Sequence, residues 1–358
     1  MSKQLTIVFF ARRFYPLIGG VEKHVLEISK RLVKKGFRVI VFTENEENTK
    51  SENYHFYPQS AKFEGIEIIR IKVGKNNRLK KFRIWFYLLK YINTIKSADI
   101  IHCHDIFFWY LPFRFIFPFK RVYTTFHGYE GNEIPTKRAV FMHKVAERLS
   151  NGNICIGSFY KKWYGTIPTY VSYGAVDVPD KSNINQQDKN LIIFLGRLEE
   201  ETGIMEYLEA FKNISKKHKD LKMLVLGDGS LRKKSETFVK TNNLNVTFKG
   251  FILDTYSYIQ RANFMFTSRY LGILESMVNK KYVLAVYNNK IKKDYLEMTP
   301  FSKYMSICAN SEDILKELNE ILGDKSFAPE KISKAYDWVK DQTWDNMFET
   351  YLMLWRLN

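Results

Sequence analysis

The chain has 358 residues, which is too long for one ordinary core and favours two domains. Its 45% hydrophobic and 16% aromatic residues are enough for packed cores and exclude a disordered protein. The formal charge of +18 favours a polyanionic partner, although a lysine-rich composition that only keeps the protein soluble explains it equally well. Three isolated cysteines argue against a disulfide framework and a structural zinc site and fit a reducing cytoplasm. We expect no signal peptide and no membrane span.

The first half of the chain alternates predicted strands with predicted helices. A strand is predicted at residues 5–10, a helix closed by glycine at 19–36 and a second strand at 38–43. This β-α-β order predicts a parallel sheet. Further strands are predicted at residues 67–71, 100–102, 122–125 and 154–156.

The second half repeats this pattern after a segment with almost no large apolar side chains. That segment, residues 175–189, is predicted to be a linker. Strands are then predicted at residues 191–196, 223–227, 246–250, 262–266 and 282–287, with helices between them. We therefore expect two doubly wound α/β domains, residues 1–174 and 190–340, with ligands at the carboxyl ends of their strands.

Three predicted strand–helix loops carry residues that suit an anion. Gly19 and Gly20 precede the first helix, whose free N–H groups and positive dipole end favour negative charge. Arg197 directly follows strand 191–196 and could grip a phosphate, or could simply pair with one of the glutamates at 199–201. The GDGS turn at 227–230 is a weaker candidate of the same kind.

Histidines and one helical glutamate are further candidates. His127 follows strand 122–125, but a lone histidine is more often structural than catalytic. His102 and His104 lack a third ligand at metal spacing, so no metal site is predicted, and no Asp-any-Asp triplet is present to hold a divalent ion. Glu275 lies in the first turns of a predicted helix, where the dipole alone stabilises a carboxylate by about 0.3–1 kcal/mol. A binding role would require it to face the cleft between the domains.

Taken in order, these motifs resemble glycosyltransferase family 4, the retaining nucleotide-sugar transferases of the GT-B fold. The matching stretches are GGVEKH, FHG, YGAVD, GRL, LGDGSL, VTFKGF, LESM and the C-terminal TWDNMFETYLMLW. Their order and spacing cover nearly the whole chain. The resemblance implies two Rossmann-like domains facing a cleft, with residues 341–358 forming a helix that packs back on the N-terminal domain.

The resemblance also implies roles for the matching residues. His127 would contact the transferred sugar, Arg197 would neutralise the diphosphate and Glu275 would bind the ribose hydroxyls. Other residues expected to contact the donor are Gly19, Gly20, Gly196, Thr202, Gly229, Gly250, Phe251, Tyr270 and Leu271. The co-substrate would be a UDP- or GDP-linked sugar, with no cofactor and no metal.

Two departures from the family pattern affect the donor site. Thr202 stands where the family has a lysine, and Thr267 stands where it has a second glutamate, on a loop about four residues shorter. Other groups would then hold the sugar or the acceptor, and Tyr270, the Leu271 backbone, Glu130 and Asp105 are the candidates. The departures indicate an unusual donor, a sub-branch with compensating contacts, or an inactive enzyme. The retained motifs favour the sub-branch.

The implied activity is retaining, metal-independent transfer of a hexose-type sugar to a hydroxyl of a glycan or lipid-linked acceptor. Residues 78–96 and 107–123 mix basic and aromatic side chains, which suits either an anionic membrane surface or a domain core with solvated lysines. We expect a cytoplasmic protein, with peripheral contact at the inner face of the cell membrane as one option. The alternative is an inactive GT-B scaffold that binds a nucleotide, glycan or anionic lipid. No recognised module supports a nucleic-acid partner.

Overall fold

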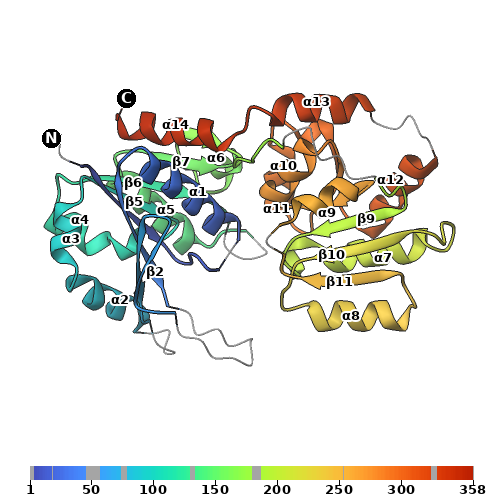
Figure 1. Ribbon diagram of the computed structural model, residues 1–358, viewed down its shortest axis with the longest axis horizontal. Coiled ribbons are helices and arrows are strands. Elements are labelled where there is room, and N and C mark those ends of the chain that lie inside the picture. Colours follow the sequence, from blue (N-terminus) through green and yellow to red (C-terminus); the bar gives the residue numbers. More distant parts are fainter. Residues whose placement is uncertain are drawn as a thin grey trace.

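Two parallel-sheet domains lie side by side in the protein (Figure 1). The computed structural model describes residues 4–17, 19–45, 57–73, 79–129, 134–179, 187–252, 254–323 and 329–357. All described strands of the first sheet end by residue 172, and those of the second begin at residue 191. The predicted fold class, two Rossmann-like domains, is confirmed.

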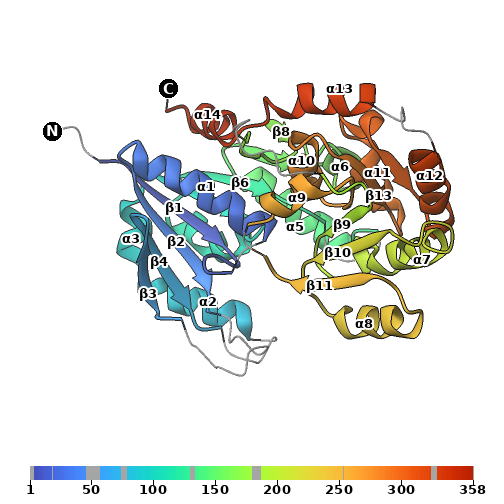
Figure 2. The same ribbon diagram turned by 45° about the vertical axis from the view of Figure 1, so that its right-hand side comes forward.

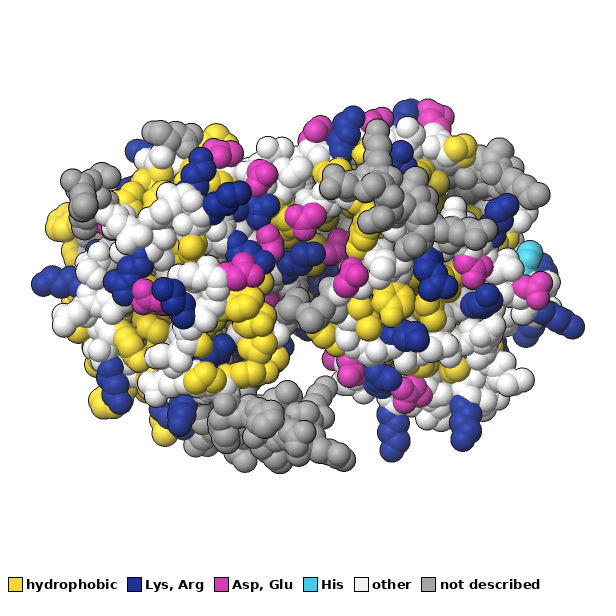
Figure 3. All heavy atoms as spheres, viewed as in Figure 1, with side chains coloured by type: hydrophobic (Ala, Val, Ile, Leu, Met, Phe, Trp, Pro, Cys, Tyr) yellow, Lys and Arg dark blue, Asp and Glu magenta, His cyan; other side chains and the backbone are white. Residues whose placement is uncertain are grey.

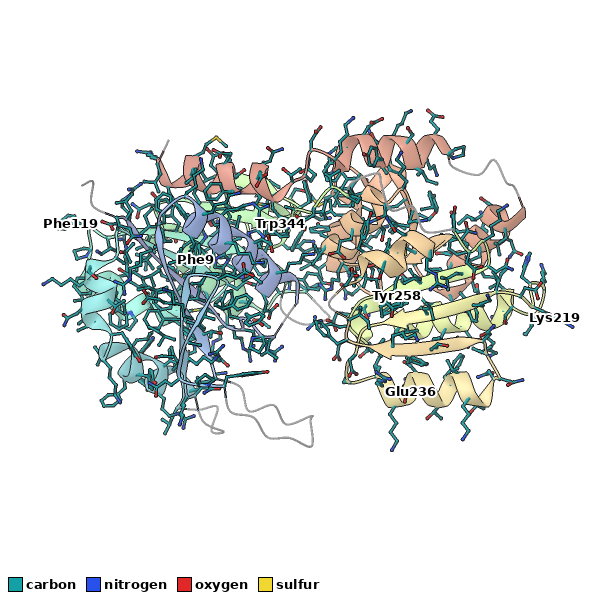
Figure 4. The ribbon with its side chains drawn as sticks, viewed as in Figure 1. Phe9, Phe119, Lys219, Glu236, Tyr258 and Trp344 are labelled. Atoms are coloured by element: carbon teal, nitrogen blue, oxygen red, sulfur yellow. The ribbon has the colours of Figure 1, made fainter. Side chains whose placement is uncertain are left out.

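The N-terminal sheet has eight strands in the order β3-β4-β2-β1-β5-β6-β7-β8. They are β1 (Thr6–Ala11), β2 (Arg38–Glu44), β3 (Ser60–Phe63), β4 (Ile66–Ile71), β5 (Ile100–His104), β6 (Arg121–Phe126), β7 (Asn153–Ile156) and β8 (Tyr170–Ser172). Every pairing is parallel except β3 with β4. Because helices cover both faces, β1 is almost entirely buried, and Phe9 lies inside the domain (Figure 4).

Short helices surround this sheet. They are α1 (Gly20–Lys34), α2 (Lys80–Leu89), α3 (Ile92–Ser97), η1 (Phe107–Trp109), α4 (Leu111–Ile116), α5 (Lys137–Leu149) and α6 (Phe159–Trp163). No helix in the described ranges is long and apolar enough to cross a bilayer.

The C-terminal sheet has six strands in the order β11-β10-β9-β12-β13-β14. They are β9 (Leu191–Leu195), β10 (Lys222–Leu226), β11 (Val246–Gly250), β12 (Phe264–Phe266), β13 (Tyr282–Val286) and β14 (Ser306–Cys308). The helices are η2 (Glu200–Thr202), α7 (Ile204–Ile214), α8 (Arg232–Thr241), α9 (Tyr256–Arg261), α10 (Tyr270–Val278), α11 (Lys290–Glu297), η3 (Ser302–Tyr304), α12 (Ser311–Gly323) and α13 (Pro329–Val339).

The strand order reverses at β1 in the first sheet and at β9 in the second. In a doubly wound sheet this reversal opens a crevice at the carboxyl ends of the strands, where ligands bind. The loops that follow β1 and β9 contain Gly19, Gly20 and Arg197. The topology therefore brings the predicted anion-binding loops to the two crevices.

The last helix, α14 (Trp344–Trp355), returns to the N-terminal domain and packs on α1 (Figures 1 and 2). Its buried face carries hydrogen-bonding groups as well as apolar ones. The Tyr351 hydroxyl is 2.8 Å from His24 Nε2 and 2.9 Å from Thr125 Oγ1, and Trp355 Nε1 donates to His102 Nδ1 over 3.0 Å. Because these polar groups are satisfied, the helix can bury both aromatic rings without a desolvation penalty. The predicted crossing helix is confirmed.

Candidate active site

An ion pair joins the two domains at their crevices. Lys23 Nζ, in the first turn of α1, lies 2.8 Å from Glu275 Oε1 in α10. Glu275 Oε2 is 3.4 Å from Thr255 Oγ1. Glu275 is the sixth residue of α10, beyond the first turn in which the helix dipole acts. Because it pairs with Lys23, its carboxylate faces the other domain, as a binding role requires.

The charge of Glu275 also acts on its partner. Burial by itself lowers the pKa of Lys23, but the charge and hydrogen bond of Glu275 outweigh it and raise that pKa above its usual value. Lys23 is therefore a fixed cation beside Glu275 at neutral pH. Figure 3 shows side chains of both charges gathered between the two halves of the molecule.

The N-terminus of α1 lies beside this pair and is not capped by a side chain. Its N-cap residue, Gly19, makes no side-chain hydrogen bond. A Cβ at Gly20 would meet no atom within 4 Å, whereas one at Gly19 would meet only the flexible end of Glu22. The backbone at Gly20 therefore faces open space, where an anionic ligand can approach the first-turn N–H groups.

Arg197, at the carboxyl end of β9, is 63% exposed at its side chain and pairs with Glu201 over 2.5 Å. The sequence left open whether Arg197 pairs with a nearby glutamate or grips a phosphate. The pairing is present, yet most of the side chain remains exposed. The neighbouring Gly196 donates its N–H to the carbonyl of Leu226 over 3.1 Å and so links the loops after β9 and β10.

Packing between two loops requires glycine at position 229, which the sequence pattern did not indicate. A Cβ there would lie 2.4 Å from the carbonyl oxygen of Leu198. Gly229 thus lets the β10 loop pack against the β9 loop, and donor contact at this position stays a prediction. Gly250 has a left-handed φ of 72° and Phe251 beside it is exposed, which leaves their predicted contact with the base open to test.

The side chains of two predicted donor contacts are engaged within the protein, so donor contact at these positions stays a prediction. Thr202 is 2% exposed, and its hydroxyl lies 2.6 Å from the carbonyl oxygen of Arg197, so it closes the turn. Tyr270 is also buried, with its ring stacked on Tyr295 at 3.9 Å and its hydroxyl donating to the Tyr295 carbonyl over 2.5 Å. Leu271 follows in the first turn of α10, and Glu130 lies outside the described residues.

His127 belongs to a cluster of four imidazoles that the sequence did not show to be close. Its Nε2 lies 2.8 Å from Nδ1 of His104, and its ring centroid is 4.7 Å from that of His24. Burial lowers the pKa of His24 to about 3 and the pKa values of His102, His104 and His127 well below the usual range. At neutral pH His127 is therefore an uncharged hydrogen-bonding group. Within the described ranges no group of three or more His, Cys, Asp or Glu could hold a metal ion.

Asp105 holds the loop that carries His127. Its Oδ1 accepts the backbone N–H of His127 over 2.8 Å, and its own φ is 61°. A left-handed conformation is uncommon for a non-glycine residue and is best tolerated by Asp and Asn. Asp105, predicted to contact the sugar or acceptor, thus has a positioning role that the sequence did not reveal.

The sequence did not single out Arg269, whose only signal is that it closely follows a strand. It follows β12, and its Nη2 lies 3.0 Å from the same Glu201 oxygen that binds Arg197. Its guanidinium lies 5.3 Å from the ring centre of Tyr129, two residues after His127 in the other domain. A basic residue at the carboxyl end of a strand, the signal that identified Arg197, would have found it.

Two family profiles together match most of the chain. Residues 18–164 match the family described as Glycosyltransferase Family 4, and residues 177–338 match the family described as Glycosyl transferases group 1.

Individual proteins agree with these profiles. An uncharacterized glycosyltransferase of Methanocaldococcus jannaschii is 24% identical over 355 residues, which cover 91% of this chain and 93% of that protein. A GalNAc-α-(1->4)-GalNAc-α-(1->3)-diNAcBac-PP-undecaprenol α-1,4-N-acetyl-D-galactosaminyltransferase of Campylobacter jejuni is 23% identical over 175 residues, 47% of this chain and 48% of that one. The Anabaena protein HepE, solved in complex with UDP, has the same fold, with a TM-score of 0.71 at 14% identity over 98% of this chain and 99% of that chain.

Proposed function

Because the chain belongs to the family 4 glycosyltransferases of the GT-B fold, we propose that it transfers a hexose-type sugar, with retention of configuration, from a nucleoside diphosphate sugar to a hydroxyl group. The observation that carries the proposal is Glu275, which faces the N-terminal domain at the crevice instead of solvent. Arg197 at the carboxyl end of β9 and the N-terminus of α1, which has no side-chain cap, support an anionic donor group. A bound UDP in the similarly folded HepE supports a nucleoside diphosphate donor.

The proposed chemistry breaks the bond between the anomeric carbon and the diphosphate oxygen. The acceptor oxygen bonds to that carbon on the same face, and its proton passes to the departing diphosphate. Arg197 and the α1 amides would stabilise the charge that develops on the diphosphate, without a metal. Glu275 would accept hydrogen bonds from the ribose, and uncharged His127 would hydrogen-bond to the sugar.

We propose a lipid-linked acceptor because α2 presents apolar side chains to the outside. Leu79, just before the helix, and Phe82, Phe86 and Leu89 within it follow one another at helical spacing, and the two phenylalanines are 62% and 70% exposed. Phe115, Ile116 and Phe119 are also exposed, and Phe119 lies at the edge of the molecule farthest from the C-terminal domain (Figure 4). Trp109 and other aromatic residues of this region are buried in the core, and the remaining ones pack against it partly buried.

Basic residues flank these apolar side chains and suit an anionic lipid surface. Lys80, at the start of α2, binds Glu44 over 2.8 Å, at the carboxyl end of β2. The exposed stripe therefore begins beside the carboxyl end of β2, the neighbour of β1 in the sheet. The undecaprenol-linked acceptor in the name of the Campylobacter relative supports an acceptor of the same class.

Nucleotide binding and turnover test the proposal together. Purified protein would be screened by thermal shift against UDP, GDP and their hexose conjugates, because a ligand that binds only the folded state raises Tm. The donor that stabilises it would then be assayed for slow release of the nucleoside diphosphate. Stabilisation and release, both reduced in Glu275→Gln, are the expected result. Stabilisation without release by any donor would favour the inactive scaffold, which the absent lysine and glutamate at positions 202 and 267 would explain.

A further inference from the structure

Two guanidinium groups share one carboxylate oxygen in the gap between the domains. Arg197 Nη2 lies 2.5 Å and Arg269 Nη2 lies 3.0 Å from Oε1 of Glu201. The three residues come from two loops, those that follow β9 and β12, which are neighbouring strands. The carboxyl ends of the two strands thus carry two positive charges and one negative charge.

A fourth charged residue nearby does not change this balance. Lys292 in α11 is fully buried and donates a hydrogen bond to the carbonyl of Ser268. Burial lowers its pKa well below the usual range, and the nearby Arg269 lowers it further. The group is therefore biased towards its neutral form, and the cluster keeps an excess of positive charge.

Arg269 is held in place from both domains. Its guanidinium lies 5.3 Å from the ring centre of Tyr129 in the N-terminal domain and 5.9 Å from that of Tyr295 in α11. Its side chain is 29% exposed. The hydroxyl of Tyr129 is buried and has no hydrogen-bond partner among the described residues. A cation of the C-terminal domain therefore lies against the ring of Tyr129, and the Tyr129 hydroxyl is a further polar group on the N-terminal side of this contact.

Arg269 lies close to Thr202, which stands where the family has a lysine. Ser268 Oγ donates to the carbonyl oxygen of Thr202 over 2.9 Å, so the two loops touch directly beside Arg269. Thr202 itself is buried and offers no side chain to a ligand. Arg269 directly follows Ser268, so its guanidinium is the basic group nearest in the chain to the contact between Ser268 and Thr202.

We propose that Arg197 and Arg269 together bind the diphosphate of the donor, with Arg269 as the second cation and Glu201 as the anion that holds both guanidiniums before the donor binds. This inference rests on the proposed function, since it names further residues of the same donor site. A diphosphate presents several oxygens to two planar donors, and arginine binds such groups in a bidentate way. The negative charge of the diphosphate would offset the excess positive charge of this cluster.

The test compares nucleotides that differ by one phosphate. Isothermal titration calorimetry would give Kd for UDP and UMP, and for GDP and GMP, with wild type and Arg269→Gln. The ratio of the two Kd values isolates the second phosphate. We expect Arg269→Gln to lower this preference for the diphosphate by about 10-fold or more, because a hydrogen bond to a charged group is lost. Arg269→Lys should retain part of it.

Two further variants complete the test. Glu201→Gln should tighten UDP or GDP binding, because the competing negative charge is removed while the side-chain shape remains. Arg261→Gln is the matched control. Arg261 is exposed at the end of α9 and lies beside Asp188, near the start of β9 and thus at the amino ends of the strands, opposite the donor site. Its Kd ratio should equal that of wild type.

The outcomes separate the two proposals. If Arg269→Gln keeps the wild-type Tm and the wild-type Kd ratio, the assignment of Arg269 is overturned while the donor site stands. If wild type binds none of the four nucleotides, the proposed function itself fails. If Arg269→Gln lowers Tm, the Kd values of Arg269→Lys and Glu201→Gln decide instead, because these substitutions are expected to leave the packing of the loop in place.

Discussion

Lys23 Nζ and Glu275 Oε1 lie 2.8 Å apart although 252 residues separate them in the chain. The pair links the first turn of α1 to α10 and places a cation beside the carboxylate proposed to bind the ribose. A bound nucleoside would either share Glu275 with Lys23 or displace it. The first prediction concerns this carboxylate.

Glu275→Gln should weaken binding of nucleoside monophosphates and diphosphates by the same factor, about 10-fold. A neutral amide accepts hydrogen bonds from ribose hydroxyls less strongly than a carboxylate does. Calorimetry with UMP and UDP, or GMP and GDP, checks this. The equal effect contrasts with Arg269→Gln, which should act on diphosphates alone. Glu320→Gln, at an exposed position of α12, serves as the control and should bind normally.

Asp105→Ala should lower the free energy of unfolding by about 2–4 kcal/mol. Alanine loses the hydrogen bond to the His127 N–H, and it tolerates the left-handed conformation at φ 61° less well than aspartate does. Asp105→Asn should lose less, because asparagine tolerates this conformation and keeps an acceptor oxygen. Urea denaturation at pH 7 measures both. Equal stability of the two variants would contradict the positioning role.

Tyr351→Phe should destabilise the protein by about 1–3 kcal/mol, because its hydroxyl bridges His24 and Thr125 in a fully buried place. Removing it leaves His24 Nε2 without this partner, whereas Thr125 Oγ1 keeps its contact with His102 Nε2 at 2.7 Å. Met353→Leu, at an exposed position of the same helix, should change little. Urea denaturation compares the two, and an unchanged midpoint for Tyr351→Phe would show that α14 is held by its apolar contacts alone.

Phe82→Asn combined with Phe86→Asn should abolish most binding to vesicles that contain phosphatidylglycerol. Each exposed ring is expected to contribute about 1.5–3 kcal/mol on insertion into the lipid interface. The Tm should not fall, because both side chains are already exposed in the folded protein. Ile167→Asn, an exposed apolar residue between α6 and β8, is the control. Vesicle co-sedimentation measures binding, and equal loss in the control would refute a specific membrane face.

Because of the histidine cluster, the free energy of unfolding should fall as the pH is lowered from 6.5 to 4.5. The folded-state pKa of His24 is about 3, below its unfolded value of about 6.5, so the unfolded chain binds more protons in this interval. Stability then rises with pH, by about 1.4 kcal/mol per pH unit for each such histidine. His24→Gln should show a smaller difference in unfolding free energy between pH 7 and pH 5. His218→Gln, outside the cluster, should keep the wild-type difference.

Much of the fold could be predicted from local pattern. Hydrophobic runs of five or six residues predicted the central strands β1, β2 and β9 within one residue of their bounds, because strands buried on both faces read as continuous apolar stretches. The short edge strands β3, β8 and β14 were not predicted, since three or four residues at a sheet edge carry too little pattern. Residues 80–97 form two helices, α2 and α3, interrupted at Lys90 and Tyr91.

The site was predicted unevenly for a related reason. The sequence by itself determined where the central strands end and the following helices begin, and so it made Gly20, Arg197, His127 and Glu275 candidates. The tertiary structure alone decided what their side chains meet: that Glu275 faces Lys23 and that His127 contacts His104. Local periodicity fixes the place of a residue along its own element, whereas these contacts depend on how two domains and distant loops pack. Arg269 and Glu201, 68 residues apart, came together for that reason only.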